Sequence, residues 1–334
     1  MSDITTAITS DDTDTAAAGA LPVRDTPAWH PLVIRPDGGP TGAEGVRGRL
    51  RALGDPGDLL AREKALVFRD FDVPEADVET VMDLLLPNRL GYLHGTSPRT
   101  QLGGNLYTST EYPQHMTIAM HSELSYSHHW PERLFFYCAT TPGGGGATPV
   151  VDGAHWLAAL DAEVREAFAG GIRYTQNLHD GIGLGRSWRQ TFETDDRDEV
   201  EAFLKAGEFT WHWDADGGLR MASPVCPATL RHPVTGAEVW FNQADHFHPA
   251  ALGDETAREL AQILPPEELP QSVTFADGSP IPDAYILHIH DRGLETAVDV
   301  DWRQGDFMVI DNVATAHGRR PYTGDRRVLV AMSG

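Results

Sequence analysis

The chain has 334 residues, with 49 acidic and 26 basic side chains and a formal net charge of −23. A surface this acidic repels nucleic acid and anionic membranes, because phosphate binding needs a basic patch. No apolar run reaches the roughly 18 residues of a membrane span, and the N-terminus lacks the basic start and apolar segment of a secretory signal. The composition therefore predicts a globular cytoplasmic protein, in which the only cysteines, Cys138 and Cys226, are buried free thiols.

Thr, Asp and Ala dominate residues 1–24, which we expect to form a disordered tail. No internal repeat or low-complexity linker divides residues 25–334, so we expect a single domain there with helical and loop insertions. Apolar residues recur with helical spacing in five segments: 42–53, 75–86, 155–168, 193–207 and 251–265. Short apolar or β-branched runs bounded by Gly, Asp and Pro predict strands within eight others: 65–73, 117–127, 133–142, 272–278, 285–293, 296–302, 305–312 and 326–332. Many short strands with few helices favour a mainly β fold, a sandwich or jelly roll with helices outside it.

The stretch MHSELSYSHHW, residues 120–130, places His121 and Glu123 two positions apart in a mostly apolar run. In a strand, side chains at i and i+2 point to the same face. An imidazole and a carboxylate on one face form either a polar pair or two thirds of a metal site. A His-x-Glu triplet alone does not separate these interpretations.

If His121 and Glu123 bind a metal, the best candidate for a third ligand is His317 in GDFMVIDNVATAHGRRPYTGDRRVLVAM, residues 305–332, where it follows a strand and a polar Asp-Asn pair. Two histidines and one carboxylate form the facial triad of non-heme Fe(II) oxygenases, which leaves coordination positions open. Zinc is the alternative metal, but structural zinc sites are usually closed, four-ligand and rich in cysteine, and neither cysteine lies beside these residues. The i, i+2 pairs His246/His248 and His288/His290 are further zinc candidates, but neither has a third partner as well placed as the GGATP and HGRR elements.

The HSE motif, WPERLFFYCATTPGGGGATPVVDG and AHGRRPYTGDRRVLVAM together resemble the taurine-dioxygenase-like (TauD/TfdA) family of Fe(II)- and 2-oxoglutarate-dependent oxygenases. SPRT, YTSTEYP and VWFNQ are similar to its branch of amino-acid hydroxylases from natural-product biosynthesis. The resemblance covers about residues 60–332 and implies a double-stranded β-helix, the jelly roll of clavaminate synthase-like proteins. It implies that Fe(II), 2-oxoglutarate and O2 are needed, and that His121, Glu123 and His317 hold the iron.

The same resemblance implies a clamp for the distal carboxylate of 2-oxoglutarate. Arg326 resembles the clamping arginine, with Arg327 as the alternative, because the two point to opposite faces of a regular strand. A guanidinium suits this role, since it grips a carboxylate through two parallel hydrogen bonds. Thr148 matches the threonine whose hydroxyl contacts the same carboxylate.

Halogenating relatives have Gly or Ala at the carboxylate position, so Glu123 favours hydroxylation of an unactivated C–H bond, with release of succinate and CO2. We expect a small substrate of the amino-acid type, free or bound to a carrier protein, contacted by Glu111, Asn242 and Gln243. For all three side chains, ordinary solvation or backbone hydrogen bonding is the alternative role. Desaturation or epoxidation in the same family, and a non-catalytic metal-binding β-sandwich, are the alternative functions. The oligomeric state, including a homo-oligomer, stays open.

Overall fold

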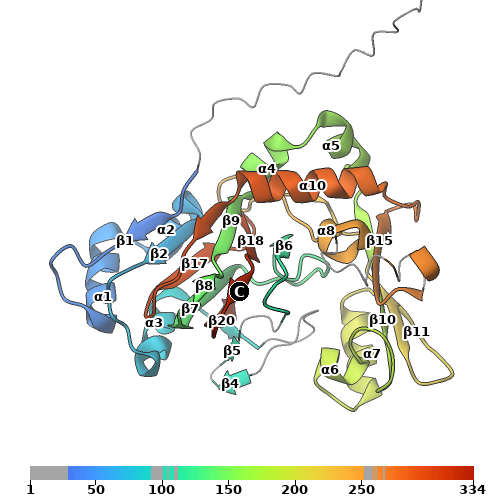
Figure 1. Ribbon diagram of the computed structural model, residues 1–334, viewed down its shortest axis with the longest axis horizontal. Coiled ribbons are helices and arrows are strands. Elements are labelled where there is room, and N and C mark those ends of the chain that lie inside the picture. The colour runs from blue at the N-terminus through green and yellow to red at the C-terminus, as the bar shows by residue number, and fades with distance from the viewer. Residues whose placement is uncertain are drawn as a thin grey trace, which may run out of the picture.

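The computed structural model describes residues 29–91, 101–103, 105–108, 112–251, 259, 262–265 and 268–334 (Figure 1). The predicted tail, Glu111 and most of the helix expected at 251–265 lie outside the described residues. Two β-sheets form the centre of the molecule, with helices beside them (Figure 1).

The larger sheet has eight strands in the order β1-β2-β17-β7-β20-β5-β4, with β3 also paired to β20. Its strands are β1 (Leu32–Ile34), β2 (Ala65–Phe68), β3 (Arg89–Leu90), β4 (Gln101–Gly103), β5 (Leu106–Thr108), β7 (Arg133–Thr140), β17 (Phe307–Asp311) and β20 (Arg327–Ser333). The central strands β17, β7 and β20 are rich in aromatic and β-branched residues, which favour a buried sheet.

The smaller sheet has four strands in the order β16-β9-β18-β6. They are β6 (Ile118–His121), β9 (Thr148–Asp152), β16 (Val298–Val300) and β18 (Thr315–Arg319). β18 runs antiparallel between β9 and β6, in a register that places the Cα of His317 opposite that of His121.

The two sheets pack face to face, and the alternation of side chains along each strand builds the core between them. On β7, Leu134, Phe136 and Cys138 point into this core, where Val150 of β9 and Val300 of β16 meet them. This sandwich is the predicted jelly roll of mainly β structure.

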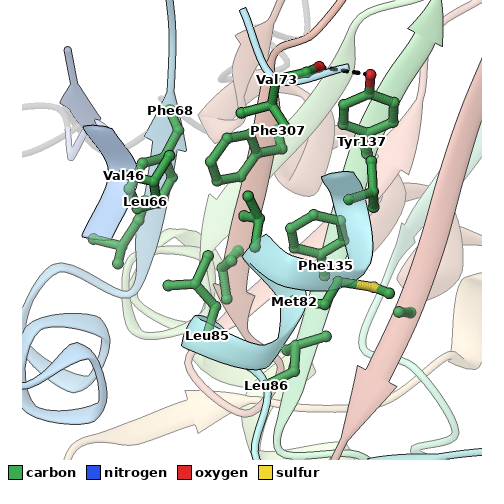
Figure 2. Close-up of a cluster of buried hydrophobic side chains, with 14 of the residues drawn as sticks. Val46, Leu66, Phe68, Val73, Met82, Leu85, Leu86, Phe135, Tyr137 and Phe307 are labelled. Carbon is green, nitrogen blue, oxygen red and sulfur yellow. Dashed lines mark hydrogen bonds between the residues drawn. The ribbon is translucent and has the colours of Figure 1, made fainter. Parts of the chain in front are cut away.

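The other side chains of β7, including Phe135 and Tyr137, point to the outer face of the large sheet, which three helices cover (Figure 1). These helices are α1 (Gly42–Leu53), α2 (Pro56–Glu63) and α3 (Val78–Leu85), the last preceded by a 3-10 turn, η1 (Glu75–Asp77). Figure 2 shows Phe135 and Phe307 of the sheet beside Met82 and Leu85 of α3, and the hydroxyl of Tyr137 donating to the carbonyl of Val73 at 2.9 Å. The helical periodicity predicted α1 with its observed ends.

The outer face of the small sheet packs against a second set of helices, among which α10 (Asp283–Thr296) is the longest of those described. This set also contains α4 (Gly153–Ala159), α5 (Ala162–Phe168), α8 (Ala244–Phe247) and the turn η2 (Pro249–Ala251). In Figure 1, α10 lies across the end of the molecule beside α4, above β9 and β18.

A peripheral unit extends from this side, with strands in the order β11-β12-β10-β15 and two short helices (Figure 1). Its elements are β10 (Ile172–Leu178), α6 (Trp188–Phe192), α7 (Arg197–Ala206), β11 (Thr210–Trp213), β12 (Leu219–Ala222) and β15 (Gln271–Phe275). Two small two-stranded sheets complete the described part of the fold: β8 (Gly144–Gly145) pairs with β19 (Tyr322–Thr323), and β13 (Thr229–Arg231) pairs with β14 (Glu238–Trp240).

Several predicted elements differ from the structure in kind or extent. The helix expected at 75–86 begins with the 3-10 turn η1, and the helix expected at 193–207 begins only at Arg197. The run YILHIHDRG, expected as a strand, lies inside helix α10, which buries Ile286, Ile289 and Gly293 at helical spacing. The alternation of Ile and His imitated a strand, although the buried positions follow the period of a helix. The helix expected at 155–168 is instead two helices, because the chain leaves helical geometry at Leu160 and α5 restarts after its N-cap residue, Asp161.

Candidate active site

The two candidate metal-binding histidines lie opposite each other on neighbouring strands. His121 ends β6 and His317 is the central residue of β18, and their rings lie 4.3 Å apart between centroids. Glu123 lies two residues beyond the end of β6, so it reaches the same side from the turn rather than from a strand. All three side chains are largely buried.

Each of these three residues offers one ligand atom, and the three atoms lie within 4.8 Å of one another. The Nε2 atom of His121 is 4.0 Å from a carboxylate oxygen of Glu123. The Nδ1 atom of His121 is 2.9 Å from the carbonyl of Ala119, a contact that favours the tautomer in which Nδ1 donates and Nε2 keeps a lone pair for a metal. Two imidazole nitrogens and one carboxylate oxygen at this spacing fit a non-heme Fe(II) ion.

A pocket opens between the two sheets beside this cluster. Its lining comes from both sheets and from the segment before β20: Ile118, His121, Phe136, Thr148, His317, Gly318, Arg319, Arg326, Val328 and Val330. The predicted clamp residues Thr148 and Arg326 thus share one pocket with both histidines.

The hydroxyl of Thr148 is held from two sides. Trp302 Nε1 donates to it at 2.9 Å, and Arg326 Nη2 lies 3.5 Å away. Because a hydroxyl has two acceptor positions and one donor, these contacts leave the Thr148 proton available to an acceptor in the pocket. Arg326 Nε donates to the carbonyl of Gly146 at 3.0 Å. Glycine at position 146 allows this close approach, because an added Cβ would lie 3.1 Å from Arg326 Cδ.

Arg326 and Arg327 have different surroundings. Burial, with a further contribution from Arg319, lowers the pKa of Arg326 to about 10, so its guanidinium is still charged near neutral pH. Arg327 instead makes a two-bond ion pair with Glu75, at 2.6 and 2.8 Å, outside the pocket. The pocket therefore receives Arg326, and Arg327 lies on the opposite side of the chain.

Arg319 lines the pocket although no role was predicted for it. Its buried guanidinium donates to the carbonyls of Tyr112, Pro113 and Met116, which fixes the segment that enters β6. The strand period could have indicated it, since Arg319 is two residues beyond His317 and β-strand side chains at i and i+2 share a face.

The side chains of Asn242 and Gln243 are bonded to backbone groups. Asn242 donates to the carbonyl of Ala228 at 2.9 Å and accepts from the amide of Ala244 at 3.0 Å. Gln243 donates to the carbonyl of Ser122 at 2.8 Å, directly beside Glu123. Both amides are buried, and Gln243 holds the backbone directly before Glu123.

The other histidine pairs do not form metal clusters. On helix α10, positions i and i+2 point to different sides, so His288 accepts from the amide of Asp161 while His290 pairs with Asp245 at 3.3 Å. The ring of His246 meets His121 edge-on at 5.1 Å, whereas His248 contacts the carbonyl of Ile281. Within the described part of the chain, the cluster of His121, Glu123 and His317 is the one group with metal-binding geometry, and both cysteines are buried and free.

A family model described as "Taurine catabolism dioxygenase TauD, TfdA family" matches residues 41–332 of the chain. The dapdiamide synthesis protein DdaC of Enterobacter agglomerans is 33% identical over 277 residues, 82% of this chain and 83% of that protein. The clavaminate synthase-like protein At3g21360 of Arabidopsis thaliana is 32% identical over 285 residues, 82% of each chain.

Among solved structures, the PvcB protein from Pseudomonas aeruginosa is 16% identical, covers 93% of this chain and 89% of its own, and has a TM-score of 0.49. A putative α-ketoglutarate-dependent taurine dioxygenase from Burkholderia xenovorans is 14% identical, covers 85% and 83%, and has a TM-score of 0.46. In the described residues, no helix combines the length and the apolarity needed to cross a membrane.

Proposed function

This chain belongs to the TauD/TfdA family of Fe(II)- and 2-oxoglutarate-dependent dioxygenases, and on that premise we propose that it hydroxylates a C–H bond of a small amino-acid-type substrate. The observation that carries the proposal is the pocket that both cluster histidines share with Thr148 and Arg326. A metal-binding sandwich without catalysis would have no need of a carboxylate clamp beside its metal. We propose that residues 25–334 act as one catalytic unit and that the enzyme works in the cytoplasm.

The proposed roles of the residues follow from their geometry. His121, Glu123 and His317 hold Fe(II) through two nitrogens and one oxygen, which leaves further positions on the ion open. When bound, Fe(II) and 2-oxoglutarate supply the oxidation of a C–H bond by O2, with succinate and CO2 as the other products. The protein positions the reactants and excludes water, because the cluster lies between two packed sheets.

We assign the distal carboxylate of 2-oxoglutarate to Arg326 and Thr148. The Arg326 guanidinium can form two parallel hydrogen bonds with a carboxylate, and the Thr148 hydroxyl can donate a third. Arg326 is buried close to a second guanidinium, that of Arg319, and both effects disfavour its charged form and lower its pKa. A bound dicarboxylate would offset this desolvation and charge repulsion. Arg327 has no part in this clamp, since Glu75 holds it elsewhere.

An amino-acid substrate is supported by the relatives and by the charge of the protein. DdaC is named for dapdiamide synthesis, and a net charge of −23 favours the approach of an ammonium group at low salt. Glu111, the proposed partner of that ammonium group, lies outside the described residues. Asn242 and Gln243 remain proposed substrate contacts. Only those of their polar side-chain atoms that are not already hydrogen-bonded to backbone groups could make such contacts.

Anaerobic titration with Fe(II) and 2-oxoglutarate tests the site itself. We expect a weak visible charge-transfer band in the wild-type protein and its loss in Glu123→Ala, together with loss of bound iron. Retention of the band and of normal iron content in Glu123→Ala would show that the cluster is not the iron site.

A substrate panel tests the proposed chemistry. Free and carrier-bound amino acids are compared with aliphatic sulfonates and aryloxyacetates, by measuring succinate and oxygenated product together under ¹⁸O2. We expect coupled turnover with ¹⁸O in the product for an amino acid. Faster coupled turnover of the non-amine acids would reject the substrate class, and an oxidised product without ¹⁸O would indicate desaturation.

A further inference from the structure

We propose that Asn312 is a positioning residue that holds the backbone of Glu123, and so sets the placement of the carboxylate ligand of the metal. The inference rests on the proposed role of Glu123 in metal binding. Asn312 lies in the turn between β17 and β18, five residues before His317, and its side chain is fully buried.

The Asn312 amide makes three hydrogen bonds, two of them to Glu123. Its Oδ1 accepts from the Glu123 amide N–H at 2.8 Å, and its Nδ2 donates to the Glu123 carbonyl at 3.0 Å. The second Nδ2 hydrogen goes to the carbonyl of Pro131 at 2.8 Å. Both donors of the amide are therefore used, and both backbone groups of Glu123 are held by one side chain.

The backbone around Glu123 needs this support because no strand supplies it. β6 ends at His121, so residues 122–124 lie outside the β-ladder. Leu124 has φ of +57°, in the left-handed region that is strained for a residue other than glycine. Such a conformation persists only where the surroundings determine it, and Gln243 supplies a further bond to the carbonyl of Ser122.

The same turn also positions the second histidine. Asp311 Oδ1 accepts from the amides of Val313 and Ala314 at 3.0 and 2.9 Å, which fixes the turn that starts β18. The turn at residues 311–314 therefore acts on both proposed ligands. It leads directly into the strand that carries His317, and its Asn312 side chain holds the backbone of Glu123. The distance between these ligands depends on a buried amide that itself binds no metal.

The test is the affinity of the full-length protein for Mn(II), measured without turnover from the electron paramagnetic resonance signal of free Mn(II). Asn312→Ala should weaken binding by about 10- to 100-fold, the range for partners that orient metal ligands. Asn312→Ser keeps one hydroxyl donor in place of the two amide donors, so we expect it to lose less Mn(II) affinity than Asn312→Ala. It also serves as a second variant in case Asn312→Ala does not fold.

Ser223→Ala is the matched control. Ser223 is buried and bonds the backbone at Tyr174 and Pro224, with no contact to a metal ligand, so its loss should lower stability and leave Mn(II) affinity unchanged. If both Asn312 variants bind Mn(II) within about twofold of wild type while Glu123→Ala loses binding, the positioning role is wrong and the metal site stands. If Glu123→Ala binds Mn(II) as wild type does, the proposed function fails instead.

Discussion

Among single residues, the neighbours Arg326 and Arg327 show how strongly the surroundings decide a role. One lines the pocket beside Thr148, and the other pairs with Glu75 on the opposite side. The sequence left both residues as candidates for the arginine that binds the distal carboxylate of 2-oxoglutarate. It did not choose between them, because the choice depends on the path of the turn from His317 to β20. A register irregularity between Arg327 and Val328 shows that this strand does not begin with regular alternation.

Replacing Arg326 by Gln should raise the apparent KM for 2-oxoglutarate. Loss of one charged partner of a desolvated carboxylate costs about 2–5 kcal/mol, or roughly 30- to several-thousand-fold in affinity. Initial rates against 2-oxoglutarate concentration measure the effect, with Arg327→Gln as the control that keeps KM near the wild-type value. An equal or larger effect in Arg327→Gln would transfer the clamp to that residue.

At the scale of elements, helix α10 and its neighbour α4 show what periodicity alone misses. Gly293 of α10 allows the Trp156 ring of α4 to lie against the helix backbone, since a Cβ on Gly293 would be 2.8 Å from Trp156 Cζ2. The indole N–H of Trp156 also donates to the carbonyl of Ile289 at 3.1 Å. This close contact holds α10 against α4, and both helices pack on the outer face of the small sheet that contains β6 and β18.

Gly293→Ala should therefore lower the free energy of unfolding, because overpacking against a buried ring costs about 1–3 kcal/mol and outweighs the helix gain of about 0.5–1 kcal/mol. Gly48→Ala is the control, since Gly48 is exposed in α1 and a Cβ added there would have no neighbouring atom within 4 Å. Urea unfolding followed by circular dichroism should show Gly48→Ala slightly stabilised and Gly293→Ala destabilised. Equal gains in both variants would refute the packing argument.

The segment after α8 should respond to acid through His248. Burial lowers the pKa of His248, and the neutral ring fits its contacts, with Nδ1 accepting from the Ala250 amide at 3.2 Å and Nε2 facing the Ile281 carbonyl. Because the folded pKa lies below that of the unfolded chain, the unfolded state binds the extra proton first. Stability should fall as the pH drops through about 6.5, the ordinary pKa of histidine.

This effect is measured as the unfolding free energy of the apo protein between pH 7.5 and 5.5. Wild type should lose more stability over that range than His248→Gln, which keeps a donor and an acceptor but does not titrate there. The same loss in both proteins would place the acid sensitivity elsewhere.

For the molecule as a whole, four layers bury the cluster: helices α1 to α3, the large sheet, the small sheet and the set containing α4 and α10 (Figure 1). Every central strand contributes one face to an outer core and the other to the core between the sheets, and the pocket lies on this inner side. The chain as a whole has a formal net charge of −23, so its charged side chains repel one another on balance.

Added salt should stabilise this molecule. Raising NaCl from about 10 mM to 150 mM shortens the Debye length from about 30 Å to about 8 Å, which screens repulsion in a protein of net charge −23. The midpoint of thermal unfolding should rise, and KCl should give the same rise if screening is the cause. A fall with salt, or a response to one cation alone, would contradict this explanation.

The sequence by itself predicted the mainly β fold, the family and the three residues proposed as metal ligands, because these depend on local patterns. Alternation along 133–140 and 327–333 follows from the geometry of a strand, and the HSE and AHGRR motifs are read directly from the chain. Only the tertiary structure decided that Arg326 rather than Arg327 faces the pocket, and that the Asn312 side chain holds the backbone of Glu123. These outcomes depend on contacts between segments far apart in the sequence, such as Asn312 with Glu123 at a separation of 189 residues, and local propensity carries no information about them.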